Sequence, residues 1–359
     1  MTIVPSIALL GRKDQPTDAL EEYCRYLSAA LIEHDIQLEI RRVPWEIHGW
    51  RDSLDALRLM ATKWRGTWVL IQYTALAWSA RGFPHRILRV FDILENAGAH
   101  VGVVFHDVQP FWANKLAEKI RRALQIRTMR QMVSRADLAV FTVPVEKLTW
   151  LSSAAPKAVF IPVGPNLPIS GSSSLSHEPP TVAVFSITGG QSGERETQMI
   201  IDALRFASRQ LGSLRLLVFG RHAELREPAL REGLRGVPIQ LSVEPVLSGQ
   251  QVAEHLCDSD VLLFVRGGIS SRRSSAIAGI ACGLPVIASA ASETAAPITD
   301  AGVAFVSLNN PHEINSALVR VLSDSAYRSE LAERSRNAYR DHFSWPAIAQ
   351  QFARLLRSS

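Results

Sequence analysis

The sequence has little cysteine and no long apolar run. Its 359 residues include three cysteines, Cys24, Cys257 and Cys282, which are odd in number and far apart. This spacing excludes a disulfide framework and the common cysteine metal sites, and it predicts reduced, structural thiols in a cytosolic protein. No apolar run approaches the ~20 residues that cross a bilayer. The N-terminus lacks the charged region and cleavage site of a signal peptide, so we interpret its apolar residues as a first core strand.

The length favours two domains, and one segment has the composition of a linker. Residues 169–180 (ISGSSSLSHEPP) are rich in serine and glycine, end in Pro-Pro and show no periodicity. They separate an N-terminal domain, residues 1–168, from a C-terminal domain, residues 181–340, and residues 341–359 form a final helix. Apolar runs alternate with helical patterns in both halves, which predicts an α/β fold with parallel sheets. The expected strands are 6–10, 37–43, 68–73, 100–105, 138–141 and 158–162, then 181–186, 214–219, 239–242, 261–265, 285–288 and 304–306.

A polar loop within residues 261–289 is the strongest sign of a ligand site. An apolar run, Val261–Val265, is followed by two glycines, by a loop rich in serine and arginine, and by a helix of small residues. The free N–H groups and the dipole of such a helix favour an anion, and glycine allows a ligand to approach the backbone. We expect a phosphate or diphosphate to bind at Gly267, Gly268, Ser270, Ser271, Arg272 and Arg273. Alternatively, the serines cap the helix, and the arginines form a solvated turn or an ion pair with the other domain.

Five segments, by their order and spacing, resemble glycosyltransferases of the GT-B fold, and most closely glycosyltransferase family 4. They are residues 103–107 (VVFHD), 159–164 (VFIPVG), 281–289 (ACGLPVIAS), 300–303 (DAGV) with 310–311 (NP), and 343–345 (FSW). The resemblance covers essentially the whole chain. It implies two Rossmann-like domains whose parallel sheets face an interdomain crevice, with the final helix packed back on the N-terminal domain.

The resemblance also implies an activity, the transfer of a sugar from a nucleotide-diphosphate donor to an acceptor. We expect a hexosyltransferase that uses neither a metal nor another cofactor, since we identify no Asp-x-Asp pair or histidine cluster suited to a metal. The expected acceptor is a lipid-linked or surface glycan at the cytoplasmic face of the membrane. Three alternatives remain: a non-catalytic nucleotide-sugar-binding or regulatory partner, a nucleotide-sugar epimerase, and a transferase with a soluble acceptor.

The sequence departs from the family where the family carries charged site residues. Ser270 and Ala278 occupy the positions of two family glutamates that lie eight residues apart. Residues 12–18 (RKDQPTD) replace the glycine pair after the first strand. Arg195 falls near the family's diphosphate-binding lysine, and the neighbouring arginine position is empty, so we expect Arg195 to contact the diphosphate unless it pairs with an adjacent glutamate. The residues expected at the nucleotide base are Pro245, Val246 and Leu247.

Three residues are candidates for catalysis. His106 and Asp107 close an apolar strand whose carboxyl end faces the expected crevice, so we expect His106 to contact the sugar or the acceptor. The alternative is a buried histidine with satisfied hydrogen bonds. Asp107 and Asp18 are candidate bases if the enzyme inverts configuration, although Asp18 is also well placed to cap the first helix.

Residues 111–135 form a basic amphipathic segment. The whole basic excess of the chain lies in residues 1–166, which hold 21 Lys and Arg against 16 Asp and Glu, while the remainder holds 18 of each. Within the segment, apolar residues recur at helical spacing among cations, which is typical of a helix on an anionic membrane surface. The alternative is a core-facing helix with a solvated basic face, and nucleic acid is not expected because the aromatics are not interleaved. The residues expected at the membrane or acceptor surface are Trp112, Lys115, Lys119, Arg121 and Arg122.

Overall fold

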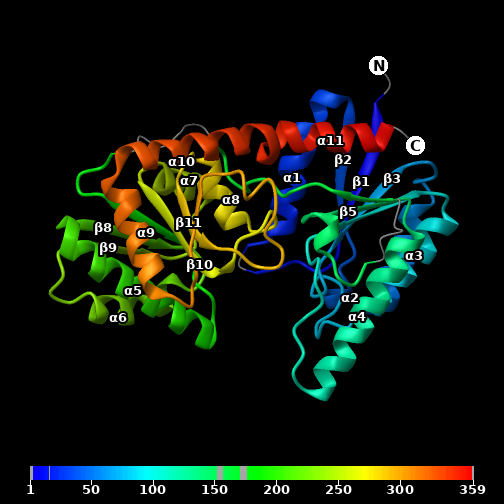
Figure 1. Ribbon diagram of the computed structural model, residues 1–359. Helices are drawn as coiled ribbons and strands as arrows, with labels where there is room; N and C mark the ends of the chain where they lie inside the picture. Colours follow the sequence, from blue (N-terminus) through cyan, green and yellow to red (C-terminus); the bar gives the residue numbers. More distant parts are fainter. Residues whose placement is uncertain (1–2, 16, 152–156, 170–175, 358–359) are drawn as a thin grey trace. The chain divides into compact units, whose positions relative to one another are not determined.

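The computed structural model describes residues 3–15, 17–151, 157–169 and 176–357. They form two compact α/β units (Figure 1). Unit 1 comprises Met1–Pro162 and Trp345–Ser359, and unit 2 comprises Val163–Ser344. Much of the predicted linker, residues 170–175, lies outside the described residues.

Unit 1 is built on a six-stranded sheet in the order β2-β1-β3-β4-β5-β6, with every neighbouring pair parallel. All six residues of β3 are buried, as expected for a central strand of a sheet covered on both faces. The edge strand β2 instead alternates buried and more exposed residues. The strands are β1 (Val4–Leu10), β2 (Ile36–Arg42), β3 (Trp68–Tyr73), β4 (His100–Phe105), β5 (Leu138–Phe141) and β6 (Ala158–Phe160).

The helices of unit 1 enclose an aromatic core that contains a stacked pair, Phe105 and Phe141, with ring centroids 4.6 Å apart. The last helix belongs to this unit: Trp345 stacks on Tyr26 at 5.6 Å, and the indole N–H of Trp68 donates to the carbonyl of Leu356 at 3.1 Å. The helices are α1 (Ala19–Leu31), α2 (Trp45–Ala61), α3 (Ile87–Asn96), α4 (Leu116–Arg135) and α11 (Trp345–Arg357), with short 3₁₀ turns η1 (Ile32–His34), η2 (Pro84–Arg86) and η3 (Val145–Lys147).

Unit 2 contains a second six-stranded parallel sheet, in the order β12-β11-β10-β7-β8-β9, around its own apolar core. Its strands are β7 (Thr181–Phe185), β8 (Leu214–Phe219), β9 (Ile239–Glu244), β10 (Val261–Gly268), β11 (Val286–Ser289) and β12 (Val303–Phe305). Its helices are α5 (Gly190–Leu211), α6 (Ala223–Gly233), α7 (Gly249–Cys257), α8 (Ser274–Ala281), α9 (Pro311–Ser323) and α10 (Ser325–Ala338), followed by a π-helical turn, η4 (Tyr339–Phe343).

The predicted α/β fold with parallel sheets is confirmed, since each expected strand is present. The largest difference is at β10, which continues to Gly268, so both glycines that were expected in the loop belong to the strand. Within the described part of the chain, no helix combines the length and apolarity needed to cross a bilayer.

Each sheet has one point at which the strand order reverses. In unit 1 it lies between β1 and β3, and in unit 2 between β7 and β10. Parallel α/β sheets bind ligands outside the carboxyl ends of the strands at this switch point, because the two flanking connections leave in opposite directions. The residues that follow β7, β8 and β10 are therefore the place to look for a ligand site in unit 2.

Candidate functional site

The backbone is strained at the carboxyl ends of β7 and β8. Ser186, directly after β7, has φ 67°, and His222, shortly after β8, has φ 65°. Gly220 directly follows β8, and a Cβ on it would come within 2.7 Å of the Ser186 hydroxyl. Left-handed conformations of residues other than glycine cost about 1–3 kcal/mol each and cluster at functional sites. Ser186 therefore places strain on β7, one of the two strands that flank the switch point, and His222 places it beside the neighbouring strand β8.

Two helices begin at this edge without a side-chain cap. Helix α5 starts after Gly189 and α8 after Arg273, and neither has a capping side chain or an acidic residue in its first turn. In contrast, α7 follows the edge strand β9 and is capped by Ser248. Open N–H groups and the helix dipole together favour an anion. Two helix N-termini with open N–H groups therefore lie at the carboxyl ends of β7 and β10.

Two arginines lie near the carboxyl ends of the strands that border β7. Arg266 belongs to β10 and Arg221 follows β8, and the Nε of Arg266 is buried with no hydrogen-bond partner among the described residues. Burial lowers the pKa of Arg266; Glu196 opposes this shift, and the positive charge of Arg221 adds to it. An unsatisfied, partly buried guanidinium is costly unless an anion binds it. This pair of cations is the clearest anion-binding feature of unit 2.

The loop from β7 to α5 is held by two further charged side chains. The Glu196 carboxylate accepts the N–H of Thr188 at 2.7 Å, and Arg226 donates from Nη2 to the carbonyl of Gly190 at 2.7 Å. The Nη1 of Arg226 also lies 3.8 Å from the Glu194 carboxylate. These contacts fix the start of α5 beside Arg266 and Arg221.

The predicted loop after β10 is organised by a carboxylate that the sequence analysis did not identify. Arg272 donates from Nε and Nη2 to Glu293 at 2.7 and 3.1 Å, and the Ser270 hydroxyl donates to the same carboxylate at 3.3 Å. Ser270 and Ser271 are buried, and the N-cap of α8 is Arg273, so the serines do not cap this helix. The ion pair of Arg272 is thus formed within unit 2.

The two glycines of β10 have different structural roles. A Cβ on Gly268 would lie 2.1 Å from the Cβ of Ala291, so this glycine allows close packing of the chain that follows β11. Gly267 has φ 76°, which favours glycine, and a Cβ on it would meet nothing within 4 Å. Only Gly267 therefore leaves open space for a ligand beside the backbone.

Three of the other residues predicted in unit 2, Arg195, Pro245 and Val246, are exposed. Arg195 lies on α5, and its side chain makes no ion pair with Glu194 or Glu196 within the described ranges. Pro245 and Val246 follow β9 at the carboxyl edge, where the Pro245 carbonyl accepts the N–H of Gly220 at 3.1 Å. Leu247 beside them is half-buried. Their predicted contacts with a diphosphate and with a base remain predictions.

In unit 1, His106 directly follows β4 and is held as a neutral imidazole. Its Nε2 lies 2.9 Å from Oε1 of Gln72, whose amide donates to the carbonyl of Leu70 at 3.2 Å. The amide oxygen only accepts, so Nε2 carries the proton and Nδ1 is an acceptor. Burial lowers the pKa of His106 to about 3, and the Tyr23 ring packs edge-on at 4.8 Å. A neutral histidine of this kind is suited to accept a hydroxyl hydrogen bond.

The two candidate bases differ in their surroundings. Asp107 is half-buried beside His106, and its carboxylate accepts the N–H of Ala75 at 2.9 Å. Asp18 is almost fully buried and forms the N-cap of α1, accepting the N–H groups of Leu20 and Glu21. Arg42 donates to Asp18 and Glu21 at 2.9 Å each and to the carbonyl of Gly11 at 3.0 Å.

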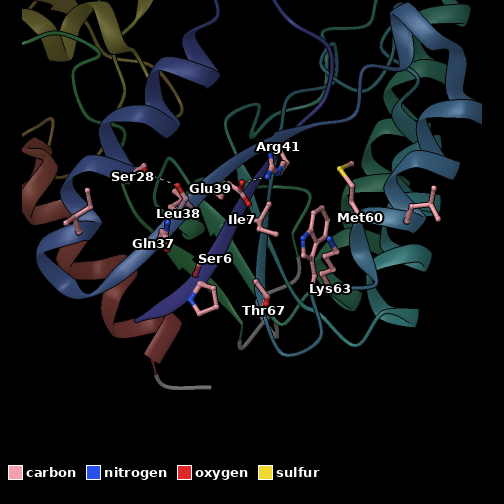
Figure 2. A pocket seen from close by; sticks show the side chains of 14 residues that line it. Ser6, Ile7, Ser28, Gln37, Leu38, Glu39, Arg41, Met60, Lys63 and Thr67 are labelled. Carbon is pink, nitrogen blue, oxygen red and sulfur yellow. Dashed lines mark hydrogen bonds and ion pairs between the residues drawn. The ribbon is translucent and has the colours of Figure 1, made fainter. Parts of the chain in front are cut away.

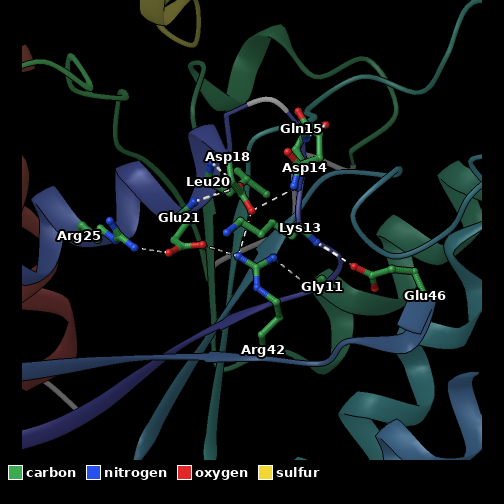
Figure 3. A network of polar contacts seen from close by, with 10 residues as sticks. All are labelled: Gly11, Lys13, Asp14, Gln15, Asp18, Leu20, Glu21, Arg25, Arg42 and Glu46. Atoms are coloured by element: carbon green, nitrogen blue, oxygen red, sulfur yellow. Dashed lines mark hydrogen bonds and ion pairs between the residues drawn. The ribbon is translucent and has the colours of Figure 1, made fainter. Parts of the chain in front are cut away.

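This network holds the loop that follows β1 (Figure 3). Lys13 N–H donates to the Glu46 carboxylate at 3.0 Å, and Asp14 N–H donates to Asp18 at 3.3 Å. The predicted N-cap of the first helix is therefore present. Since the Asp18 carboxylate is already bonded by backbone N–H groups and a guanidinium, its role as a base remains a prediction.

A hollow of about 920 Å³ lies elsewhere in unit 1 (Figure 2). It is lined by the first residues of β1, by β2 and by Thr67 just before β3. The β1 residues and Thr67 lie at the amino ends of their strands, away from His106 at the carboxyl edge, and His106 is not among the lining residues. The hollow is therefore separate from the candidate site.

The residues predicted at a membrane or acceptor surface lie on α4 and just before it. Trp112, Lys115 and Lys119 are exposed, and Trp112 and Lys115 precede the first turn. Arg121 and Arg122 are half-buried: Arg121 lies over the Phe111 ring at 5.2 Å, and Arg122 donates to the Phe111 carbonyl at 3.4 Å. The second pair thus packs against the chain before the helix.

Acidic and thiol groups do not gather into a metal site in the described ranges, where no group of three or more His, Cys, Asp or Glu side chains is arranged to hold a metal ion. Asp258 and Asp260 do form an Asp-x-Asp pair. However, the Asp260 carboxylate accepts the N–H of Thr181 at 2.7 Å and of His177 at 3.2 Å. This pair lies at the amino ends of β7 and β10, at the edge opposite the candidate site.

Four residues that organise these two edges are not among the site residues named from the sequence, although Arg266 lies at the start of the polar loop identified there. Arg221 follows β8 by two residues, and Arg266 lies within β10 directly after its apolar run, and these positions were a usable signal once the strand order was known. Gln72 is a lone polar side chain in the apolar strand β3, which also could have indicated a buried partner. Glu293 carried no local signal, because its contact with Arg272 spans 21 residues.

Comparisons with known proteins identify the fold of the chain. No protein-family profile matches it, and no curated protein sequence matches it. Solved structures do match: HepE of Anabaena, in complex with UDP and glucose, is 14% identical with a TM-score of 0.66, over 99% of this chain and 100% of HepE. Sucrose-phosphate synthase of Thermosynechococcus elongatus is 18% identical with a TM-score of 0.68, over 99% and 98%.

A third match has a different type of activity in its name. A putative UDP-N-acetylglucosamine 2-epimerase of Listeria monocytogenes is 13% identical with a TM-score of 0.62, over 99% of this chain and 96% of the epimerase. All three matches extend over both units. Together with the two parallel sheets, they show that the chain has the GT-B fold, built from two Rossmann-like units.

Proposed function

We propose that the protein is a glycosyltransferase that moves a sugar from a nucleotide-diphosphate donor to an acceptor hydroxyl. The observation that carries the proposal is the buried, unpartnered Nε of Arg266 beside Arg221, at the switch point of the second sheet. Two uncapped helix starts, those of α5 and α8, lie at the same edge. A diphosphate is the ligand that this combination of cations and N–H groups fits best.

The diphosphate is also the leaving group of the reaction, so its developing charge must be stabilised. The acceptor oxygen forms a bond to the anomeric carbon, and the bond from that carbon to the phosphate oxygen breaks. The nucleoside diphosphate leaves with the electron pair, so negative charge grows on its phosphates in the transition state. Arg266, Arg221 and the helix starts would stabilise that charge without a metal or other cofactor, and Arg272 and Arg273 are proposed to add to it.

Unit 1 is proposed to contact the sugar and the acceptor through His106 and Asp107. A histidine whose pKa is lowered to about 3 is too weak a base near neutral pH, so His106 accepts a hydrogen bond and does not take the proton. Asp107 is the better candidate to receive the acceptor proton. We propose a hexose as the transferred sugar and a lipid-linked or surface glycan, at the cytoplasmic face of the membrane, as the acceptor.

UDP is the first nucleotide to test, because HepE, of the same fold, was solved with UDP and glucose. The purified protein is incubated with a panel of UDP-, GDP- and ADP-sugars, with and without added glycan acceptors, and release of nucleoside diphosphate is measured. A transferase releases nucleotide from one donor, and faster with its acceptor. If no donor is hydrolysed, transferred or bound, the enzyme proposal is wrong.

The same assay separates an epimerase from a transferase. The epimerase alternative is supported by the Listeria structure, which shares the fold. It predicts that the free nucleotide sugar is isomerised reversibly without an acceptor. Donor isomerisation of this kind, without net transfer, would favour the epimerase over the proposal.

A further inference from the structure

Two of the three cysteines lie together in unit 2. Cys257 is the last residue of α7 and is partly exposed, whereas Cys282 directly follows α8 and is fully buried. Their thiols are in hydrogen-bond contact, and Cys282 is the donor. All three cysteines are free thiols, and the third, Cys24, is buried in unit 1. Unit 2 therefore holds a pair of thiols whose sulfur atoms are already neighbours.

The pair joins the far ends of two helices that begin at the candidate site. Helix α7 starts after Ser248, directly behind the predicted base segment 245–247, and α8 starts after Arg273, the last residue of the loop 270–273. Both helices run from the carboxyl edge of the sheet to its amino edge, and they pack against each other (Figure 1). At 1.5 Å per residue each is only about 12–14 Å long. A bond between the thiols would therefore connect the segments predicted to contact the base and the diphosphate.

Helix α8 has little room to move at its end. A Cβ on Gly279 would lie 2.5 Å from Cδ2 of Leu262, and a Cβ on Gly283 would lie 3.0 Å from Cγ of Arg336. The helix thus packs closely on β10, and the turn after it packs on α10. The end of α7 is less confined, because Asp258, which follows it, is exposed. If the two sulfur atoms approach each other, α7 is the helix that moves.

Cys257 is the thiol that a dissolved oxidant reaches first, because it is the partly exposed member of the pair. The hydrogen bond from Cys282 lowers the pKa of Cys257 to about 7, so a substantial share of this residue is thiolate at neutral pH. Redox-sensor cysteines combine a low pKa with access to solvent and a second cysteine close by. Cys257 has these properties, and Cys282 is placed to be the second cysteine.

We propose that Cys257 and Cys282 form a reversible disulfide on exposure to a hydroperoxide, and that this bond weakens nucleotide binding. The Cys257 thiolate attacks one oxygen of the peroxide, the O–O bond breaks, and a sulfenic acid and hydroxide result. The Cys282 sulfur then attacks the sulfenic sulfur, the S–S bond forms, and the hydroxyl group leaves with the Cys282 proton as water. The two cysteines lose two electrons in total, and hydrogen peroxide is reduced to water. A dithiol reductant reverses the reaction by exchange.

The disulfide is expected to act on the site through α7. An S–S bond is about 2.05 Å long, which is shorter than a hydrogen-bonded contact between two sulfur atoms, so the end of α7 must move toward α8. The short helix transmits this movement to Ser248 and to residues 245–247, which shift relative to the loop before α8. The effect on nucleotide binding rests on the proposed function, whereas the formation of the disulfide does not.

Peptide mapping tests the disulfide. Full-length protein is treated with hydrogen peroxide, digested without reductant and analysed by mass spectrometry. We expect a cross-linked peptide pair that contains Cys257 and Cys282, with Cys24 unmodified. In Cys282→Ala, dimedone should trap a sulfenic acid at Cys257, and Cys257→Ser should give neither product. Cys24→Ala is the matched control for loss of a buried thiol, and it is expected to form the same cross-link as the wild type.

Calorimetric titration of UDP tests the effect on the site. The oxidised wild type is expected to bind UDP at least about threefold more weakly than the reduced protein, and dithiothreitol is expected to restore the affinity. Cys257→Ser should bind UDP equally well before and after peroxide treatment, because it cannot form the bond. Cys24→Ala should lose affinity on oxidation as the wild type does.

Three outcomes would overturn the inference. One is oxidation of Cys257 to a sulfinic acid while the Cys282 thiol stays free, and another is a disulfide between two chains. The third is equal UDP affinity of the reduced and the oxidised wild type with the Cys257–Cys282 bond present. Reduced protein that binds no nucleoside diphosphate would contradict the proposed function and with it the effect on binding, while the peptide map still decides whether the disulfide forms.

Discussion

Arg272 and Glu293 form a bidentate ion pair in which Nε and Nη2 donate to the two carboxylate oxygens at 2.7 and 3.1 Å. The side chains are 21% and 12% exposed, so the pair is partly shielded from water. It ties the loop before α8 to the chain that follows β11. A carboxylate therefore does stand beside this loop, although it comes from a part of the sequence after the position of the missing family glutamates.

The contributions of Arg272 and Glu293 to the free energy of unfolding are expected to be coupled. Arg272→Ala and Glu293→Ala should each lower the free energy of unfolding by about 1–3 kcal/mol, because each leaves a partly shielded charge without its partner. The double variant should cost less than the sum of the two. Denaturant unfolding of the four proteins gives the coupling energy, and additive single effects would show that the pair does not stabilise this loop.

Asp18 is expected to act on stability through its cap and its ion pair. Asp18→Ala should lower the free energy of unfolding by about 1–3 kcal/mol, since α1 loses its cap and Arg42 loses a carboxylate. Asp18→Asn should cost less, because asparagine keeps the cap. If Asp18 is instead the catalytic base, the opposite pattern is expected: Asp18→Asn lowers kcat a hundredfold or more, while the free energy of unfolding is unchanged. Chemical unfolding and kcat of both variants distinguish the two roles.

His106 is expected to make stability depend on pH. Its pKa is about 3 in the folded protein, below the ordinary value of 6.5, so the unfolded chain binds the proton first as pH falls. Wild-type stability should therefore decrease relative to His106→Gln from pH 6.5 downward, by at most about 1.4 kcal/mol per pH unit. Unfolding of both proteins from pH 7.5 to pH 5 measures this difference. A constant difference across the range would mean that the imidazole titrates normally.

Cys257 is expected to be the reactive thiol of the chain. It is partly exposed at the end of α7, whereas Cys24 and Cys282 are buried. A hydrogen bond from the Cys282 thiol lowers the pKa of Cys257 to about 7, while the same contact and burial raise that of Cys282. Alkylation of native protein by iodoacetamide should occur at Cys257 with a midpoint near pH 7. Cys282→Ala should move the midpoint upward, and a wild-type midpoint near pH 9 would exclude the thiol–thiol contact.

The strands and the fold class could be predicted because apolar runs of four to six residues are recognisable as buried strands from local sequence alone. β3, β4 and β8 begin and end where the sequence predicts. The exception is β10, where a register irregularity between Phe264 and Gly268 carries the strand past its apolar run. A bulge of this kind depends on the neighbouring strand β11, which local sequence does not reveal.

The candidate site was harder to predict because its contacts join distant segments. The sequence indicated the loop before α8 but not Glu293, and it indicated His106 but not Gln72. Arg221 and Arg266 come together only through the strand order β10-β7-β8, which places both around β7. For α4, the helical periodicity of the apolar residues could be recognised from the sequence. The face of the helix that is buried could not be predicted, because it follows from the packing of the second half of the helix.

The most direct test of the account is calorimetric titration of UDP into the wild-type protein, Arg266→Ala and the control Arg209→Ala. Arg209 is an exposed cation in the last turn of α5, at the end of the helix far from the site. We predict that the wild type and the control bind UDP alike, and that Arg266→Ala binds at least tenfold more weakly, a loss of about 1.4 kcal/mol or more. Equal UDP affinity of Arg266→Ala and wild type, or binding of no nucleoside diphosphate by the wild type, would contradict it.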